Sequence, residues 1–186
     1  CAIAALALWS LNLSGQLMSA ITLTLEPLSA EAFAPFGDVI ELSEKNSVLP
    51  INYGLTERHH DLAKVELSGG RAQINLFNTQ PVTLPYQLQI MERHPLGSQA
   101  FIMLTGNPYL VVVAEAGEFD YKNLRAFYVK AHQGVNYHKG TWHHFCLGLN
   151  DTNQFAVIDR GGEGDNCDEV NFPEGITVTL SNEVPQ

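Results

Sequence analysis

Apolar and polar residues alternate along several short segments, as they do in half-buried β-strands. Residues 21–25 (ITLTL) and 176–180 (ITVTL) show this period of two most plainly. Similar runs recur along the rest of the chain. The predicted strands are 21–25, 39–42, 72–77, 86–91, 99–104, 109–114, 124–129, 145–149, 155–159 and 176–180.

Turn-forming residues separate these runs, and a helical period is almost absent. Turn signals lie at 69–70, 106–108, 150–151 and 161–162. One short helix is predicted within 28–36, with Ser29 as its N-cap and an end before Pro35. Nine or ten short strands with so little helix indicate a β-sandwich or a β-barrel. The fold class is therefore all-β, with one or two short helices.

Two segments, residues 1–17 and residues 44–68, do not fit the pattern of predicted strands. Residues 1–17 are apolar through Leu13 and precede Met18, but they are too short to span a bilayer and lack the basic start of a signal peptide. We interpret 1–17 as an upstream or non-native extension and 18–186 as a single domain. Residues 44–68 are the most polar and least periodic segment, which predicts a mobile loop or lid.

Composition narrows the choice of partners. The chain has 186 residues, 45% of them hydrophobic, which is enough for one good core. Its formal net charge of -10 argues against nucleic acid and anionic membranes as partners. The three cysteines, Cys1, Cys146 and Cys167, have no metal-type spacing and form no even framework, which favours a reducing cytoplasm. No base is evident beside Cys167, so covalent catalysis is not expected.

Residues 135–144 (VNYHKGTWHH) concentrate more chemistry than any other ten residues. Three of the seven histidines fall there, with Tyr137, Lys139 and Trp142, around the single glycine Gly140. Such a cluster offers metal ligands, proton-transfer groups and an anion anchor together. The alternative is a surface turn with scattered histidines.

A second chemical segment, residues 92–99 (ERHPLGSQ), lies some forty residues earlier. The period of two places Glu92 and His94 on one face of a strand. Read together, the two segments resemble the paired motifs of the cupin superfamily, with Gly106 and Gly140 at the turn positions. The resemblance implies metal-ligand positions at Glu92, His94, Gln99 and His143.

This donor set implies a divalent metal. Two imidazoles, one carboxylate and one amide suit nickel, manganese, iron or zinc, although less well than three histidines and a glutamate. Because neighbouring residues on a strand point to opposite faces, only one of His143 and His144 can face the interior. The spacing to Gly140 favours His143, which leaves His144 as the partner of a surface or interface group.

At the level of whole motifs the chain resembles the ureidoglycolate lyase family over about residues 21–180. The motifs that carry the resemblance are 92–101, 111–114, 134–144, 159–162 and 166–167. The resemblance implies a cupin-like β-barrel (jelly-roll), commonly a homodimer, acting on a small-molecule substrate. Such an enzyme splits (S)-ureidoglycolate into glyoxylate and urea in allantoin degradation, with a divalent metal for which nickel is usually named.

The residues can be fitted to that reaction. A base must take the hydroxyl proton, an acid must protonate the departing urea nitrogen, and a cation must hold the carboxylate. His94 and His143 suit the metal or base role, because neutral imidazole serves both. His138 is expected to line the entrance.

Several further residues are candidates for contact with the substrate. Lys139 and Arg93 could hold the carboxylate. Strand alternation sends Arg93 to the opposite face unless a bulge intervenes, so Lys139 or Arg160 is the better anchor. The ureido amide needs donors and acceptors, and aromatic residues are expected at the barrel mouth. The residues considered for these roles are Ser98, Asn136, Tyr137 and Trp142.

Three alternatives remain open. A non-catalytic cupin could sense a ureide or glyoxylate through its dimer, although no DNA-binding segment or basic patch is evident. A metal-dependent oxygenase or isomerase would need a fuller set of histidine and carboxylate ligands. Asp159 and Arg160 could form only a strand-end ion pair.

Overall fold

The structure, a computed structural model, describes residues 6–11 and 17–185. Within that part the regular elements are eighteen strands, one four-residue α-helix and two short 3-10 helices. None of these helices has the length and apolar character that crossing a membrane requires. The predicted all-β class is therefore confirmed, with three short helices where one or two were expected.

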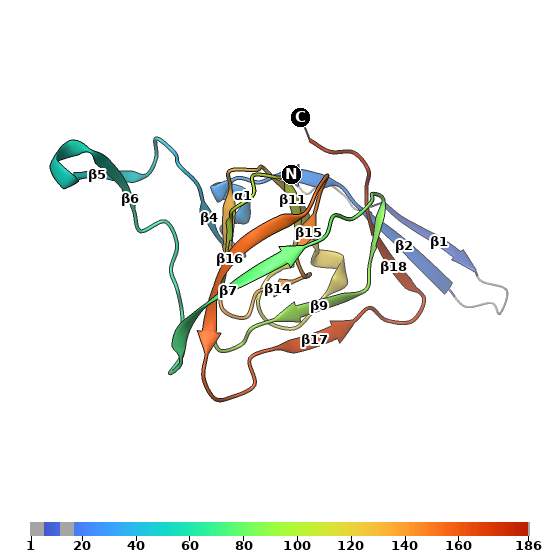
Figure 1. Cartoon of the computed structure of the whole chain (residues 1–186). Coiled ribbons are helices and arrows are strands. Elements are labelled where there is room, and N and C mark those ends of the chain that lie inside the picture. Colours follow the sequence, from blue (N-terminus) through green and yellow to red (C-terminus); the bar gives the residue numbers. More distant parts are fainter. Residues whose placement is uncertain (1–5, 12–16, 186) are drawn as a thin grey trace.

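Two sheets face each other across the interior of the molecule (Figure 1). The five-stranded sheet has the order β4 (Gly37–Ile40), β13 (Gly134–Tyr137), β10 (Gln99–Met103), β16 (Asn153–Gly161), β7 (Arg71–Thr79). The seven-stranded sheet has the order β17 (Asp168–Asn171), β9 (Ile90–Arg93), β14 (Trp142–His143), β11 (Tyr109–Ala114), β12 (Arg125–Val129), β3 (Leu25–Pro27), with β15 (Leu147–Gly148) beside β11. Two facing, mostly antiparallel sheets are the arrangement of a jelly-roll barrel.

A third layer covers the outer face of the seven-stranded sheet. Its strands, in order, are β1 (Leu6–Leu11), β2 (Leu17–Leu23), β18 (Ile176–Leu180) and β8 (Tyr86–Leu88). Strand β11 lies between the layers, and all six of its residues are buried. Val111 and Val113 pack toward the five-stranded sheet, whereas Leu110 and Val112 pack toward β2 and β18. A strand buried on both faces needs no polar alternation, which explains the apolar run at 109–114.

The central part of residues 44–68, predicted to form a mobile loop or lid, is a β-hairpin. Strands β5 (Ser47–Ile51) and β6 (Thr56–His60) pair antiparallel around the 3-10 helix η1 (Asn52–Gly54). This hairpin projects from the body of the molecule (Figure 1), and every residue of β5 is exposed. A strand that is exposed on both faces does not need alternating apolar and polar residues, so the sequence pattern did not indicate it. We refer to residues 47–60 as the arm and to residues 62–70, which return to the body, as the strap.

Elsewhere some predicted elements differ at their ends, one predicted strand is divided, and several elements were not predicted. The helix α1 covers Ala30–Phe33, and Ser29 caps it by accepting a hydrogen bond from the Ala32 amide. The predicted strand 86–91 is two strands in different sheets, β8 and β9, and 145–149 shortens to β15. The second 3-10 helix, η2 (Tyr121–Asn123), was not predicted, nor were strands β13, β14 and β17.

The extension predicted over residues 1–17 lies partly outside the described residues, because 1–5 and 12–16 are not described. Residues 6–11 form β1, which pairs antiparallel with β2 from Leu6 opposite Thr22 to Leu11 opposite Leu17. The assignment of a single domain to 18–186 stays a prediction.

Candidate functional site

Three predicted metal-ligand positions meet between the two facing sheets. Glu92 on β9 lies directly opposite His143 on β14, so their side chains share a face. One potential ligand atom from each of Glu92, His94 and His143 lies within 4.8 Å of the others. The structure therefore brings together the two half-motifs that the sequence separates by some forty residues.

The tautomer of His94 is set by the backbone. Its Nδ1 lies 2.6 Å from the carbonyl oxygen of Asn166, which can only accept, so Nδ1 carries the hydrogen. In the neutral ring Nε2 is then the atom with a free lone pair, and Nε2 is buried without a hydrogen-bond partner. A histidine whose second nitrogen donates to a carbonyl is typical of a metal ligand.

His143 is held as a neutral imidazole. Burial, together with the neighbouring His94, lowers its pKa from 6.5 to about 3. The ring of Tyr137 on β13 stacks on it, with 4.3 Å between ring centroids and 1° between planes. His143 Nε2 is also buried and unpartnered. At neutral pH this ring is unprotonated and can donate a lone pair to a cation, whereas its low pKa makes it a weak proton acceptor.

Glu92 completes this group. Its Oε1 lies 3.7 Å from His143 Nδ1. Burial raises the pKa of Glu92, against the opposing effect of His94. A cation bound beside this carboxyl group would favour its ionised form and would lower its pKa strongly.

The fourth predicted ligand, Gln99, lies on the opposite sheet. It pairs with Tyr137 across β10 and β13, and its Oε1 is buried without a partner. Unpartnered buried polar atoms are rare in folded proteins, and a bound water or ion is one way to satisfy them. The two imidazole nitrogens and the carboxylate of His94, His143 and Glu92 fit a divalent cation of the borderline class. Gln99 faces them from the opposite sheet as a candidate fourth donor.

Two residues beside Glu92 were missed by sequence reasoning. Cys167 Sγ lies 3.9 Å from Glu92 Oε2, and Glu169 on β17 lies directly opposite Glu92. Burial, with Glu92 and Glu169 as further causes, raises the pKa of the Cys167 thiol. The motif at 166–167 carried the family resemblance, but sequence alone assigned it no neighbour.

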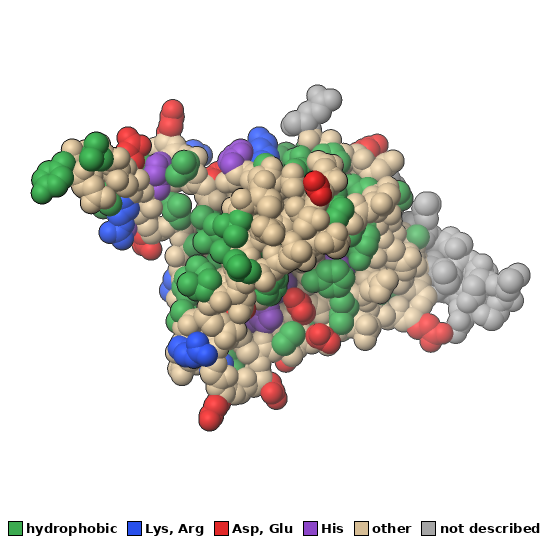
Figure 2. Space-filling model, viewed as in Figure 1, with side chains coloured by type: hydrophobic (Ala, Val, Ile, Leu, Met, Phe, Trp, Pro, Cys, Tyr) green, Lys and Arg blue, Asp and Glu red, His purple; other side chains and the backbone are tan. Residues whose placement is uncertain are grey.

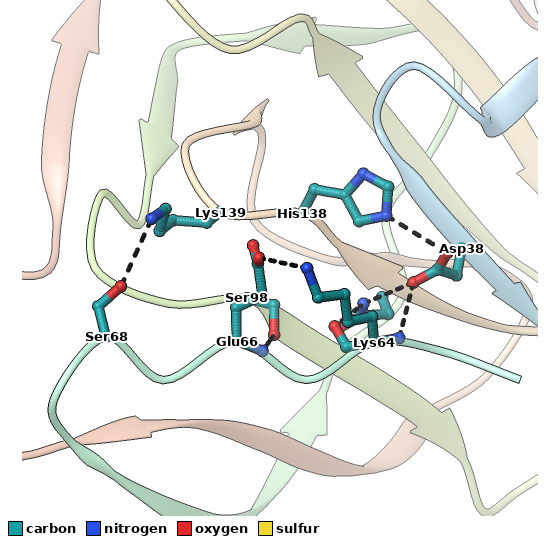
Figure 3. A network of polar contacts seen from close by, with 8 residues as sticks. Asp38, Lys64, Glu66, Ser68, Ser98, His138 and Lys139 are labelled. Atoms are coloured by element: carbon teal, nitrogen blue, oxygen red, sulfur yellow. Dashed lines mark hydrogen bonds and ion pairs between the residues drawn. The ribbon is translucent and has the colours of Figure 1, made fainter. Parts of the chain in front are cut away.

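A second group of predicted site residues contacts the strap instead (Figure 3). The Ser98 amide donates to the Glu66 carbonyl at 2.9 Å, and the Ser98 hydroxyl accepts from the Glu66 amide at 2.8 Å. Asn136 Nδ2 donates to Asp38 Oδ2 at 2.9 Å and to the Lys64 carbonyl at 3.1 Å. Ser98 and Asn136 therefore both bind the backbone of the strap, and Asn136 also binds Asp38, which accepts from the Lys64 amide of the strap.

His138, Lys139 and Arg160 belong to the same region. His138 Nε2 lies 3.3 Å from Asp38 Oδ1, and Lys139 Nζ lies 3.4 Å from Ser68 Oγ (Figure 3). Arg160 is buried and donates to the carbonyls of Leu67, Ser68 and Glu163. Asp159 instead accepts from Asn75, so the expected Asp159–Arg160 ion pair does not form.

Arg93 and Trp142 lie on the opposite face of the seven-stranded sheet from His143. Arg93 Nε donates to Asp168 Oδ2 at 2.8 Å, and its guanidinium lies 4.5 Å from the centre of the Trp142 ring. The pairing of β9 with β17 continues through Glu92 without a bulge, so the alternation predicted for Arg93 is confirmed. His144 was expected at a surface or interface, but it is buried against Tyr86 and Phe145, where burial lowers its pKa to about 4.

An open cleft of about 580 Å³ lies elsewhere, between α1, β4 and the base of the arm. His138, His60 and Asp38 are among its lining residues, but Glu92, His94 and His143 are not. His138 therefore lines this cleft and lies apart from the group of Glu92, His94 and His143.

Known proteins provide a separate comparison. The model of the ureidoglycolate lyase family matches residues 20–179. A ureidoglycolate lyase of Burkholderia mallei is 53% identical over 160 residues, 85% of this chain and 94% of the relative. Another from Pseudomonas aeruginosa is 50% identical over 162 residues, 86% of this chain and 95% of the relative.

Among solved structures, RmlC from Streptococcus suis, described in complex with dTDP-D-xylose, aligns with a TM-score of 0.38 and 13% identity. That alignment covers 50% of this chain and 46% of the other. The family match, in contrast, spans most of the chain, and the residues that carried the resemblance lie within it. The chain belongs to the ureidoglycolate lyase family.

Proposed function

We propose that this chain is a lyase that cleaves (S)-ureidoglycolate to glyoxylate and urea. The observation that carries this function is the family match over residues 20–179, with relatives of 50% to 53% identity that bear the enzyme's name. A non-catalytic sensor is not favoured, because these relatives are named as enzymes over nearly their whole length.

The reaction breaks one carbon–nitrogen bond. The substrate carbon carries a carboxylate, a hydroxyl and a ureido group. Loss of the hydroxyl proton lets the oxygen electrons form the aldehyde carbonyl of glyoxylate, while the carbon–nitrogen pair leaves with urea and takes up a proton. A site for this reaction needs a proton acceptor, a proton donor and a positive group for the carboxylate.

Glu92, His94 and His143 are the residues we propose to hold a divalent cation, with Gln99 beside them. When bound, that cation would supply a Lewis acid for the hydroxyl and carboxylate oxygens. Nickel is our specific proposal, because imidazole nitrogens suit it well.

The remaining roles belong to the protein's own side chains. Tyr137 fixes the plane of the neutral His143 ring, and the Asn166 carbonyl fixes the tautomer of His94. We keep Lys139 as the proposed group for the carboxylate. His138 was the other candidate for catalysis, but it lies beside Asp38 in a cleft that Glu92, His94 and His143 do not line, so we do not assign the proton transfer to it. Lys139 Nζ is bound only to Ser68 Oγ in the contacts described, at 3.4 Å, which is a weak hold on a flexible amine.

The assembly we propose is a homodimer. The arm and the outer face of β7 expose large apolar side chains (Figure 2). Strand β7 is an edge strand nine residues long, and its Ile74 and Leu76 are 76% and 77% exposed. A long exposed apolar edge invites association, and a second copy would cover it.

We also propose that the enzyme acts in the cytoplasm, in allantoin and purine nitrogen breakdown. The free thiols of Cys146 and Cys167 suit a reducing compartment.

The test of the function is glyoxylate release from (S)-ureidoglycolate. Chelator-treated protein is assayed alone and with nickel or manganese added back, and spontaneous decay of the substrate is subtracted. Turnover restored by metal is the expected result. Turnover that needs no added metal would support the lyase activity and contradict the proposed role of the cation. No turnover under any condition would overturn the proposed function.

A further inference from the structure

A carboxylate, that of Asp159 on β16, lies on the inner face of the five-stranded sheet. This face looks across the interior toward the seven-stranded sheet, which carries His143. We propose that Asp159 binds the N–H groups at the ureido end of the substrate and thereby selects ureides. The inference rests on the proposed function, because it takes ureidoglycolate as the substrate.

The strand register gives Asp159 its inward direction. Phe101 on β10 lies directly opposite Val157 on β16, and both side chains belong to the core between the two facing sheets. Gln99 lies two residues before Phe101, and Asp159 lies two residues after Val157. Because side chains alternate along a strand, Gln99 and Asp159 also point inward, and the same register continued along the strands places them opposite each other.

A contact with Asn75 on β7 agrees with this placement. Asn75 lies directly opposite Val157, so it shares the inner face. Its Nδ2 donates to Asp159 Oδ1 at 3.2 Å and to Oδ2 at 3.4 Å. In the part of the chain that the structure describes, no Lys, Arg or His side chain forms an ion pair with Asp159. An ionised carboxylate has about four lone-pair sites, so a single amide donor leaves acceptor positions of Asp159 free for a ligand.

Gln99 lies between Asp159 and the buried donor group. It is directly opposite Tyr137, whose ring stacks on His143. The Gln99 side chain is 6% exposed, and its Oε1 is buried without a hydrogen-bond partner. Asp159 does not belong to the group of potential metal ligands that lie within 4.8 Å of one another. Strands β13 and β16 are two strand spacings apart, about 10 Å, and side chains from both ends shorten the distance that a ligand must span.

The acceptors on this face define the class of ligand. Asp159 offers a carboxylate and Gln99 offers an amide oxygen on neighbouring strands. A ureido group carries more N–H donors than carbonyl acceptors, so it is complementary to this pair. Hydrogen bonds from N–H groups to a carboxylate are stronger than those between neutral groups, which makes Asp159 the main contributor to recognition.

Charge also sets the direction in which the substrate binds. The carboxylate of Asp159 repels the carboxylate of the substrate, because like charges across an interface are unfavourable. The substrate carboxylate is therefore directed away from β16, toward the proposed cation and Lys139. The ureido end, with the leaving nitrogen, then lies along the five-stranded sheet. A ligand without ureido N–H groups would leave Asp159 without its partner, which is a strong basis for discrimination.

The test uses two ligands that differ by one carbamoyl group. Oxamate and oxalurate both end in a carboxylate beside an amide carbonyl, and oxalurate carries the further carbamoyl group. Calorimetry measures the Kd of each ligand for the wild-type protein and for Asp159→Asn, which keeps the shape of the side chain and removes its charge. Oxalurate should bind about 10- to 100-fold more weakly to the variant. Oxamate should bind as tightly as before or more tightly, because a repulsion is removed, and KM for (S)-ureidoglycolate should rise with the Kd of oxalurate.

Two further variants complete the experiment. Asp151→Asn is the matched control, because Asp151 is exposed in the loop before β16, and it should leave both Kd values unchanged. Asn75→Ala removes the amide that positions the Asp159 carboxylate, so it should weaken the binding of oxalurate and leave that of oxamate unchanged. Thermal unfolding checks the fold of each variant.

Three results would overturn the inference. The first is an Asp159→Asn protein that binds oxalurate as tightly as the wild type. The second is an equal loss of both ligands, which would indicate a general disturbance of the interior. The third is a wild-type protein that does not prefer oxalurate to oxamate.

Glyoxylate release by the same preparations distinguishes this inference from the proposed function. An active wild type whose KM is unchanged in Asp159→Asn keeps the proposed function and overturns the role of Asp159. An inactive wild type that binds oxalurate through Asp159 overturns the proposed function and leaves the ureide site standing.

Discussion

The ring of Tyr137 stacks on the imidazole of His143 with 4.3 Å between centroids and planes 1° apart. The two residues come from opposite sheets, Tyr137 from β13 and His143 from β14. Tyr137, on the five-stranded sheet, therefore fixes the plane of the His143 ring on the facing seven-stranded sheet. A site whose donor is oriented by packing in this way needs little rearrangement to bind its ligand.

The replacement His143→Ala is expected to abolish turnover while the fold persists. It removes a donor from the group of Glu92, His94 and His143, and the expected loss in kcat/KM is on the order of 100-fold or more. His144→Ala is a matched control, because His144 is equally buried but lies outside that group. Activity is measured as glyoxylate release, and the fold by thermal unfolding. Near-wild-type activity of His143→Ala with a normal melting curve would contradict the site assignment.

Arg160 is expected to hold the strap rather than to bind substrate directly. Its guanidinium donates to the carbonyls of Leu67, Ser68 and Glu163. Arg160→Ala leaves the carbonyls of Ser68 and Glu163 without this partner, whereas the Leu67 carbonyl still accepts from the Gly70 amide. The loss should cost about 1–3 kcal/mol. The measurement is amide hydrogen exchange over residues 62–70, which should become faster in the variant.

The exposed Arg58 on the arm supplies the control, since Arg58→Ala should leave exchange in the strap unchanged. Unchanged protection of the strap in Arg160→Ala would show that other contacts suffice, such as those of Ser98 with Glu66.

Burial of His144 should make the stability of the protein depend on pH. Burial lowers its pKa from 6.5 to about 4 in the folded state, whereas the unfolded chain takes up the proton near 6.5. Between these values the unfolded state binds more protons. The stabilisation is therefore complete above pH 6.5 and is lost as the pH falls toward about 4, by up to about 1.4 kcal/mol per pH unit.

The measurement is the free energy of unfolding in urea at several pH values, for the wild type and for His144→Phe. Other groups titrate in both proteins, so the difference in slope isolates His144. The variant should show the shallower dependence, and parallel curves would contradict the predicted protonation of His144 on unfolding.

The interior of the fold could be predicted from the sequence because burial imposes a pattern on it. Strands β16 and β18 bury one face more than the other, and the burial of their residues alternates over much of their length. Glu92 and His94 were placed on one face by the same period, and the structure brings them to His143.

The remaining features depend on contacts between distant segments. The arm has no buried face, so its strands left no periodic signal. Ser98 and Asn136 were expected near the substrate, but they bind the strap, whose path the sequence did not reveal. Cys167 meets Glu92 only through the pairing of β17 with β9, a register that two short strands do not specify by pattern.

The last prediction concerns the apolar edge of the molecule. If a second copy covers the outer face of β7, then Leu76→Lys places a charge in that interface and should convert the dimer to a monomer. Leu76 is 77% exposed in the single chain, so the change should have little effect on the stability of the monomer. Leu42→Lys is the matched control: Leu42 is 75% exposed and follows β4, at the opposite edge of the same sheet. Molar mass by light scattering should fall by half in Leu76→Lys and stay unchanged in Leu42→Lys. A monomeric wild-type protein would contradict the proposed homodimer. A dimeric Leu76→Lys variant would show that the interface lies elsewhere, and the arm would be the next surface to mutate.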